Sequence, residues 1–122
     1  LIAGFVIDGP GPQRVLIRAA GSALAAAPFN VAGALPNPQL AVFRGSSPLK
    51  SNDDWFRDAD AVAIRDAASR ARAFSFGPQS ADSAVLLFLE PGAYTAVVSA
   101  SATSPAAQAT GLALIELYDA SP

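Results

Sequence analysis

The 122-residue sequence contains neither cysteine nor histidine. Without cysteine, the chain forms no disulfide and offers no thiol nucleophile or thiolate ligand. Without histidine, it lacks the base of a Ser-His triad and the commonest side-chain ligand of zinc and haem iron. These two absences exclude thiol catalysis, Ser-His catalysis, and metal centres built on cysteine or histidine.

Charge is also scarce: Asp, Glu, Lys and Arg together make up 15% of the chain, and the formal net charge is -2. The few Arg residues and the one Lys are scattered, so they form no basic patch for a phosphate backbone. No apolar run approaches the roughly 18 residues of a membrane-spanning helix. The sequence therefore predicts neither a nucleic-acid partner nor insertion into a membrane.

Apolar residues, by contrast, supply 52% of the chain, which is enough to bury a core and excludes disorder. The length is that of one domain, so residues 1–122 are expected to fold as a single unit. Short apolar or alternating runs bounded by Gly and Pro are typical of β-strands. Seven such runs predict strands over residues 1–7, 14–20, 39–44, 49–51, 84–89, 93–100 and 111–118.

One segment has a helical period instead. Over residues 58–74 the apolar side chains fall broadly on one side, while Asp60, Arg65 and Arg70 fall on the other. Asp58 at its start has the side chain of an N-cap. We therefore expect a mainly β protein, a two-sheet β-sandwich with one inserted helix that covers an end of the core.

Two turn sequences separate neighbouring strands. Residues 45–48 (GSSP) predict a hairpin between the two strands on either side of them. Residues 90–92 (EPG) predict a second, tight hairpin that pairs strand 84–89 with strand 93–100.

Several strings of the sequence together resemble a known repeat module. They are LIAGFVI, RVLIRAAG, SNDDW, LEPGAYTAVVSA and TGLALIELYD, which extend over essentially the whole chain. Such modules occur in very large secreted and cell-surface proteins of environmental bacteria, and they are distantly similar to the pre-peptidase C-terminal type of β-sandwich. The resemblance implies an extracellular, non-catalytic domain that serves as one repeat or subunit of a larger assembly.

The chain departs from this resemblance at its start. The similar modules have a further short strand before the segment that matches residues 1–7. The absence of that strand predicts an unpaired edge or open groove, which a strand from outside the chain would fill. The interface predicted by this reasoning consists of Leu1, Ile2, Phe5, Ile7, Leu112, Leu114 and Tyr118.

Strand complementation of this kind joins copies head to tail, as a filament or a tandem array. The predicted function is therefore that of a non-enzymatic structural or adhesive module, whose partners are copies of itself or adjacent repeats. In the competing interpretation, residues 101–109 cover the edge and the domain stays isolated.

The corner at residues 52–56 offers an alternative function, that of an accessory module that binds calcium or carbohydrate. Asn52, Asp53 and Asp54 carry the oxygen ligands that calcium prefers, although the spacing of an EF-hand is absent. The same three residues also suit turn and capping roles. Trp55 and Phe56 have rings that stack on a surface glycan or fill a core. The residues alone leave both interpretations open.

The remaining acids and serines form no catalytic pattern. Glu90 lies in a predicted turn and Glu116 in a predicted strand, and nothing in the sequence pairs them as a glycosidase requires. Ser22 lacks the flanking glycines of a nucleophile elbow. The sequence predicts no enzyme and no cofactor apart from the possible calcium ion, and both glutamates are expected at the surface.

Overall fold

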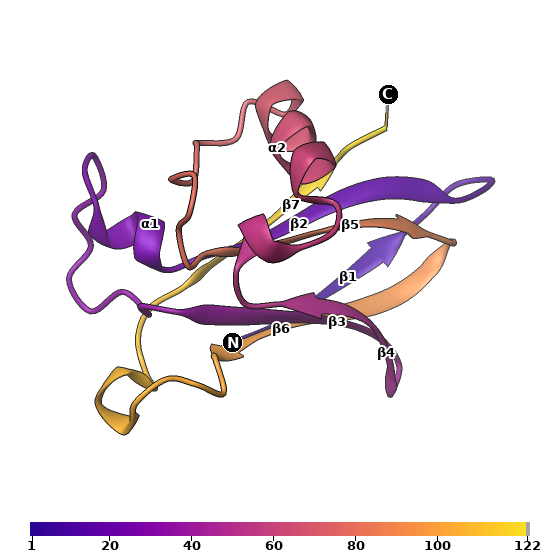
Figure 1. Ribbon diagram of the computed structural model, residues 1–122. Coiled ribbons are helices and arrows are strands. Elements are labelled where there is room, and N and C mark those ends of the chain that lie inside the picture. The colour runs from indigo at the N-terminus through magenta and orange to yellow at the C-terminus, as the bar shows by residue number, and fades with distance from the viewer. Residues whose placement is uncertain (122) are drawn as a thin grey trace.

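The computed structural model describes residues 1–121 (Figure 1), in which seven strands and four helical segments follow one another. The strands are β1 (Ile2–Ile7), β2 (Gln13–Ala20), β3 (Pro38–Arg44), β4 (Ser47–Asn52), β5 (Ser83–Leu89), β6 (Gly92–Ala100) and β7 (Leu114–Asp119). The helices are α1 (Ser22–Ala25) and α2 (Ala61–Arg70), and the 3-10 turns are η1 (Trp55–Arg57) and η2 (Ala106–Gln108).

The strands form two antiparallel sheets that pack face to face. One sheet has the order β1-β6-β3-β4, and the other has the order β5-β2-β7. Strands β3 and β4 form the hairpin predicted from the GSSP sequence. The prediction of a mainly β fold with seven strands in two sheets is confirmed.

Alternation along the strands directs one set of apolar side chains into the layer between the sheets. Phe5 of β1 and Ile115 of β7 pack half-buried against this layer. Its buried members are Ile7, Val15, Ile17, Ala19, Leu35, Leu40, Val42, Val85, Leu89, Tyr94, Ala96 and Val98. The core of the sandwich therefore draws on both sheets.

Helix α2 forms a third layer on the outer face of the three-stranded sheet, as Figure 1 shows. Ile64 and Ala67 of α2 pack there with Leu16 of β2, Ala84 of β5 and Trp55. The expectation that the helix covers an end of the core was wrong. Leu16 and Ala84 make the outer face of this sheet apolar, so the helix lies where apolar surface needs cover.

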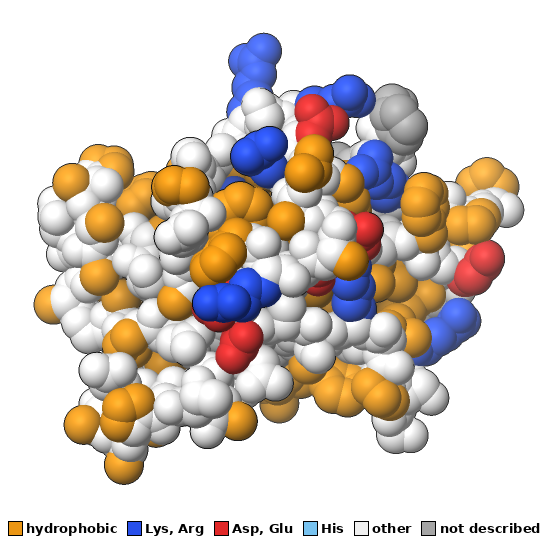
Figure 2. Space-filling view, in the orientation of Figure 1, with side chains coloured by type: hydrophobic (Ala, Val, Ile, Leu, Met, Phe, Trp, Pro, Cys, Tyr) orange, Lys and Arg blue, Asp and Glu red, His pale blue; other side chains and the backbone are white. Residues whose placement is uncertain are grey.

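The helix is also shorter than the predicted 58–74. Asp58 Oδ1 accepts a hydrogen bond of 2.8 Å from the Asp60 N–H, and this turn delays the helix start to Ala61. Arg72 has a φ of 59°, which is incompatible with a continuing right-handed helix. Within residues 1–121 no helix is both long and apolar enough to cross a membrane. Figure 2 shows charged side chains gathered over α2.

The EPG sequence links the two sheets rather than two neighbouring strands. Strand β5 pairs with β2, whereas β6 pairs with β1 and β3, so the predicted hairpin was wrong. Val85 of β5 and Tyr94 of β6 approach the same core from opposite sheets, which requires the chain to cross between them. The Tyr94 hydroxyl donates a hydrogen bond of 2.6 Å to the Glu90 carbonyl and anchors this crossover.

The last strand begins later than predicted, at Leu114 rather than residue 111. Leu112 instead bonds to the loop before β3, where its N–H donates to the Gly33 carbonyl and its carbonyl accepts from the Leu35 N–H. Gly111, with a φ of 158°, permits this close approach, because a Cβ atom there would lie 2.7 Å from the Leu35 nitrogen.

Candidate functional site

The sandwich has two lateral sides whose strand edges end differently. On one side, which we call the closed side, the edge strands β4 and β5 contact each other. On the opposite side, which we call the open side, the edge strands are β1 and β7. These two sides contain most of the residues that the sequence marked as candidates.

Asn52 joins the two sheets on the closed side. Its Oδ1 accepts a hydrogen bond of 3.2 Å from the Ala84 N–H, and its Nδ2 donates to the Ala84 carbonyl. The side-chain amide thus supplies β5 with the two bonds that a neighbouring strand would otherwise make at this point. The Asn52 side chain thus links β4 to β5.

The other two predicted calcium ligands have separate partners. Asp53 Oδ2 accepts a hydrogen bond of 2.6 Å from the Ser101 hydroxyl, and Asp54 Oδ2 lies 3.2 Å from Arg57 Nε. The three side chains therefore do not converge on one point. In the described part of the chain, no three His, Cys, Asp or Glu side chains gather as metal ligands do.

Asp58, close to this corner, collects several hydrogen-bond donors. Its carboxylate accepts from the Asp60 N–H and from Asn52 Nδ2, and Lys50 Nζ lies 3.5 Å away. Burial raises the pKa of Asp58, but these donors and the Lys50 charge outweigh it and hold the pKa below its usual value. The charged carboxylate therefore stabilises the approach to α2.

Trp55 and Phe56 are used in packing. Trp55 is buried, and its Nε1 donates a hydrogen bond of 3.3 Å to the Gly77 carbonyl. Phe56 is half-buried and meets the Trp55 ring edge to face, with 6.4 Å between the ring centroids. Both rings belong to the cluster beneath α2, so they do not form an exposed platform for a sugar.

Strand β1 leaves a free backbone edge on the open side. The amino group of Leu1 donates to the Val98 carbonyl at 3.1 Å, and the Val98 N–H donates to the Leu1 carbonyl at 2.8 Å. From this pair, antiparallel alternation points the N–H and C=O groups of Ile2, Gly4 and Val6 away from β6. The Ile2 and Val6 side chains are 70% and 71% exposed.

Strand β7 leaves a second free edge on the same side. The Ala120 N–H donates a hydrogen bond of 2.9 Å to the Arg14 carbonyl of β2. Alternation from this pair directs the backbone groups of Ile115, Leu117 and Asp119 away from β2. Leu117 lies on the same face of β7 as Ile115, which packs against the core, yet the Leu117 side chain is 39% exposed. The layer between the sheets is thus open to solvent here.

The predicted interface residues occupy two settings. Those exposed at or beside the open side are Leu1, Ile2, Leu112 and Leu114. Phe5 and Ile7 point into the core instead, and Tyr118 packs half-buried in the cluster beneath α2. Val6 and Leu117 were missed, although the alternation that includes Ile2 also places Val6 on the outer face of β1.

The loop of residues 101–109 starts away from the open side. The Ser101 N–H donates a hydrogen bond of 2.9 Å to the Asn37 carbonyl, and its hydroxyl donates to Asp53. These residues flank β3 and β4, so the loop is fastened at its start beside those strands and not beside β1.

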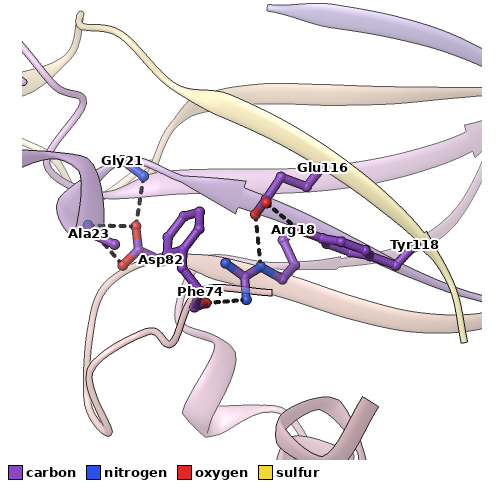
Figure 3. A network of polar contacts seen from close by, with 7 residues as sticks. All are labelled: Arg18, Gly21, Ala23, Phe74, Asp82, Glu116 and Tyr118. Atoms are coloured by element: carbon purple, nitrogen blue, oxygen red, sulfur yellow. Dashed lines mark hydrogen bonds and ion pairs between the residues drawn. The ribbon is translucent and has the colours of Figure 1, made fainter. Parts of the chain in front are cut away.

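A buried ion pair fastens β7 to β2, and the sequence did not predict it (Figure 3). Arg18 Nε donates to Glu116 at 3.0 Å and Nη1 donates to the Phe74 carbonyl at 2.7 Å, while Tyr118 donates its hydroxyl to Glu116. The Glu116 side chain is 14% exposed, so the expectation of a surface residue was wrong. The register that sets Arg18 opposite Glu116 explains this burial.

The same network changes the acidity of Tyr118. Burial raises the pKa of the phenol, and the hydrogen bond and negative charge of Glu116 raise it further. The Arg18 charge offsets part of this, and the resulting pKa of Tyr118 is about 12. The phenol therefore remains a hydrogen-bond donor to Glu116 at neutral pH.

Asp82 is a second buried carboxylate that sequence reasoning missed. It accepts hydrogen bonds from the Gly21 and Ala23 N–H groups at 2.7 and 3.0 Å (Figure 3). The carboxylate thus caps the first turn of α1 from a distant part of the chain. Its role, like that of Asn52, is to hold separate elements together.

The two glutamates considered as catalytic acids lie far apart along the sheet. Glu116 is level with Ala84, near the start of β5, whereas Glu90 follows the end of that strand. Comparison with protein-family models, curated proteins and solved structures gives no match to this chain. The geometry of the two lateral sides is thus the basis for a functional assignment.

Proposed function

We propose that this protein is a non-enzymatic structural module of the extracellular space or cell surface, which joins another copy of itself through its open side. The copies are separate subunits or adjacent repeats, and joined modules form the unit of a filament or tandem array. The observation that supports this function is the presence of two free strand edges, those of β1 and β7, on one side of the sandwich.

The backbone of the open side suits strand addition. Ile2, Gly4 and Val6 of β1 direct hydrogen-bonding groups outward, and Leu117 of β7 does the same. Such edges are templates for the backbone of another chain, and strand addition satisfies their donors and acceptors. A partner strand at this side would also remove the exposed surface of Leu117 from water.

The charge of these edges favours a second copy as the partner. Strand β1 contains no charged residue, no proline and no bulge, which are the usual devices that keep an edge unpaired. On β7, Arg18 neutralises Glu116, and Asp119 lies at the end of the strand. An uncharged strand such as β1 of another copy therefore meets little electrostatic opposition.

Sedimentation velocity over a range of about 1 μM to 1 mM tests this association. We expect the native chain to form dimers and larger species as concentration rises. Val6→Lys places a charge on the β1 edge and is expected to weaken association at least tenfold, roughly 1.4 kcal/mol. The matched control is Val62→Lys, because Val62 is 72% exposed but lies on α2.

A second variant changes the edge without adding charge. Gly4→Pro removes an N–H that points away from β6, so it spares the internal ladder while blocking strand addition. Circular dichroism checks that each variant is folded. A native chain that stays monomeric over the whole range, or equal effects of Val6→Lys and Val62→Lys, would contradict the proposal.

A further inference from the structure

A cavity of about 440 Å³ lies beneath α2, and none of the residues that line it comes from β1 or β7. Its walls are one side of α2, the outer face of β2 and β5, and residues 73–78. Trp55, Ile64 and Phe76 are the large apolar side chains of the lining. A volume of this order is usual for sites that hold small organic ligands.

Arg18 brings a buried positive charge to this cavity. Its side chain is 1% exposed, and its guanidinium carbon lies 4.6 and 3.8 Å from the ring centroids of Phe74 and Phe76. Nε and Nη1 have partners, but Nη2 has no hydrogen-bond partner within residues 1–121. Buried donors are rarely left unpaired, so Nη2 is a donor without a protein partner on a residue that lines the cavity.

Arg65 adds a second guanidinium at the rim. It lies on the exposed part of α2 and also lines the cavity. The salt bridges that involve α2 or its N-cap use Asp66, Arg70 and Asp60, and none of those formed by the described residues uses Arg65. The two guanidinium groups carry two positive charges, whereas Glu116 supplies one negative charge. The remaining positive charge favours an anionic ligand.

We infer that this cavity binds a small carboxylic acid with an apolar body, such as an aromatic acid. The body fits against Trp55, Ile64 and Phe76, while the carboxylate faces the guanidinium groups of Arg18 and Arg65. Guanidinium N–H groups bind carboxylates with matched geometry, and they do so more strongly where water is excluded. This inference is independent of the proposed assembly, because the cavity and the open side share no residue.

Isothermal titration calorimetry with phenylacetate tests the inference, and phenylacetamide serves as the neutral comparison at the same ionic strength. We expect saturable one-to-one binding of phenylacetate and at least tenfold weaker binding of the amide. Arg65→Ala is expected to weaken binding at least tenfold, and Ala68→Leu to abolish it by filling the cavity. Arg70→Ala is the control, because Arg70 lies on the same helix outside the cavity lining.

These variants keep the buried Arg18 intact, so a loss of binding is separable from a loss of folding, which a melting curve measures for each. Three results would overturn the inference. They are equal affinity for acid and amide, native affinity in Arg65→Ala or Ala68→Leu, and no saturable binding of phenylacetate at concentrations up to about 10 mM.

Discussion

The two lateral sides of this sandwich use opposite solutions to the same problem. Each side brings one strand edge from each sheet to the surface, with backbone groups that need partners. On the closed side, Asn52 spans the gap from β4 and satisfies the Ala84 backbone of β5 with its own amide. On the open side, no such bridge joins β1 to β7 among the described residues, and Ile2 and Val6 remain exposed.

The difference teaches that a sandwich does not need continuous strand pairing to close an edge. On the closed side, hydrogen bonds from Asn52 to Ala84 and from the Trp55 N–H to the Asp82 carbonyl take the place of such pairing. On the open side, β7 is fastened from its outer face instead, through the Arg18–Glu116 pair. The edge of β7 that pairs with β2 is thereby held in place, while the backbone groups on its other edge stay accessible.

The largest effect is expected from breaking the fastening of β7. Glu116→Ala leaves the Arg18 charge buried without its partner, and we expect it to lower the free energy of unfolding by about 3 kcal/mol. Urea unfolding followed by circular dichroism measures this loss. The control is Asp66→Ala, which removes an exposed pair with Arg70 and is expected to cost less than about 0.5 kcal/mol. If the two variants lost equal amounts of unfolding free energy, burial would not make the Arg18–Glu116 pair more important than the exposed pair.

The closed side is tested by Asn52→Ala. The substitution leaves the Ala84 N–H and carbonyl without partners at the edge of β5, and we expect a loss of about 2 kcal/mol in the free energy of unfolding. Asp54→Ala, at the same corner but paired with exposed Arg57, is expected to lose less than about 0.5 kcal/mol. A loss for Asn52→Ala no greater than that of Asp54→Ala would show that other contacts close this side.

Alkaline pH tests the open side through Tyr118. The folded pKa is about 12 while the unfolded value is 10.0, so the unfolded chain releases its proton first as pH rises. The contribution of Tyr118 to the free energy of unfolding is therefore fully present below pH 10 and is lost between pH 10 and about 12. Allowing for solvent screening, this loss is roughly 1 kcal/mol. Urea unfolding across this range measures the loss, and Tyr118→Phe is expected to remove it. A loss of the same size in Tyr118→Phe would assign it to other groups.

The smallest effect is expected from a chelator. Asn52, Asp53 and Asp54 each have separate partners, so we expect hydrogen bonds rather than an ion to hold the closed side. We therefore expect EDTA to change the melting temperature by less than about 1 °C at matched ionic strength. If a cation were bound only to the folded state, its removal would lower the melting temperature. A fall of several degrees would return the corner to the calcium interpretation.

The sequence was sufficient to predict the strands, because their apolar alternation is a local property. Val15 and Ile17 turn to the core between the sheets, while Leu16 turns to the opposite face, which is the alternation expected of a strand. The GSSP hairpin was also predictable from turn chemistry. These features depend on neighbours within a few residues.

The errors arose where distant segments decide the outcome. The EPG turn has the residues of a hairpin, but the same residues serve a crossover between sheets, and only the pairing of β5 with β2 distinguishes the two. Glu116 was expected at the surface because its partner, Arg18, lies 98 positions away in the sequence. The candidate interface was only partly predictable for a related reason: which edges stay free depends on the order of strands in each sheet.

The placement of β1 and β7 has a mechanical consequence. Both strands run in the same direction in separate sheets, so the start of β1 and the end of β7 lie towards opposite ends of the sandwich. A pull transmitted along the chain therefore draws each strand lengthwise past its neighbour, β1 past β6 and β7 past β2. Because the hydrogen bonds of an antiparallel ladder stand perpendicular to the strands, they resist this shear together rather than opening one by one. In a tandem array of such domains, tension would thus load each domain in the direction in which its strand pairing resists unfolding most.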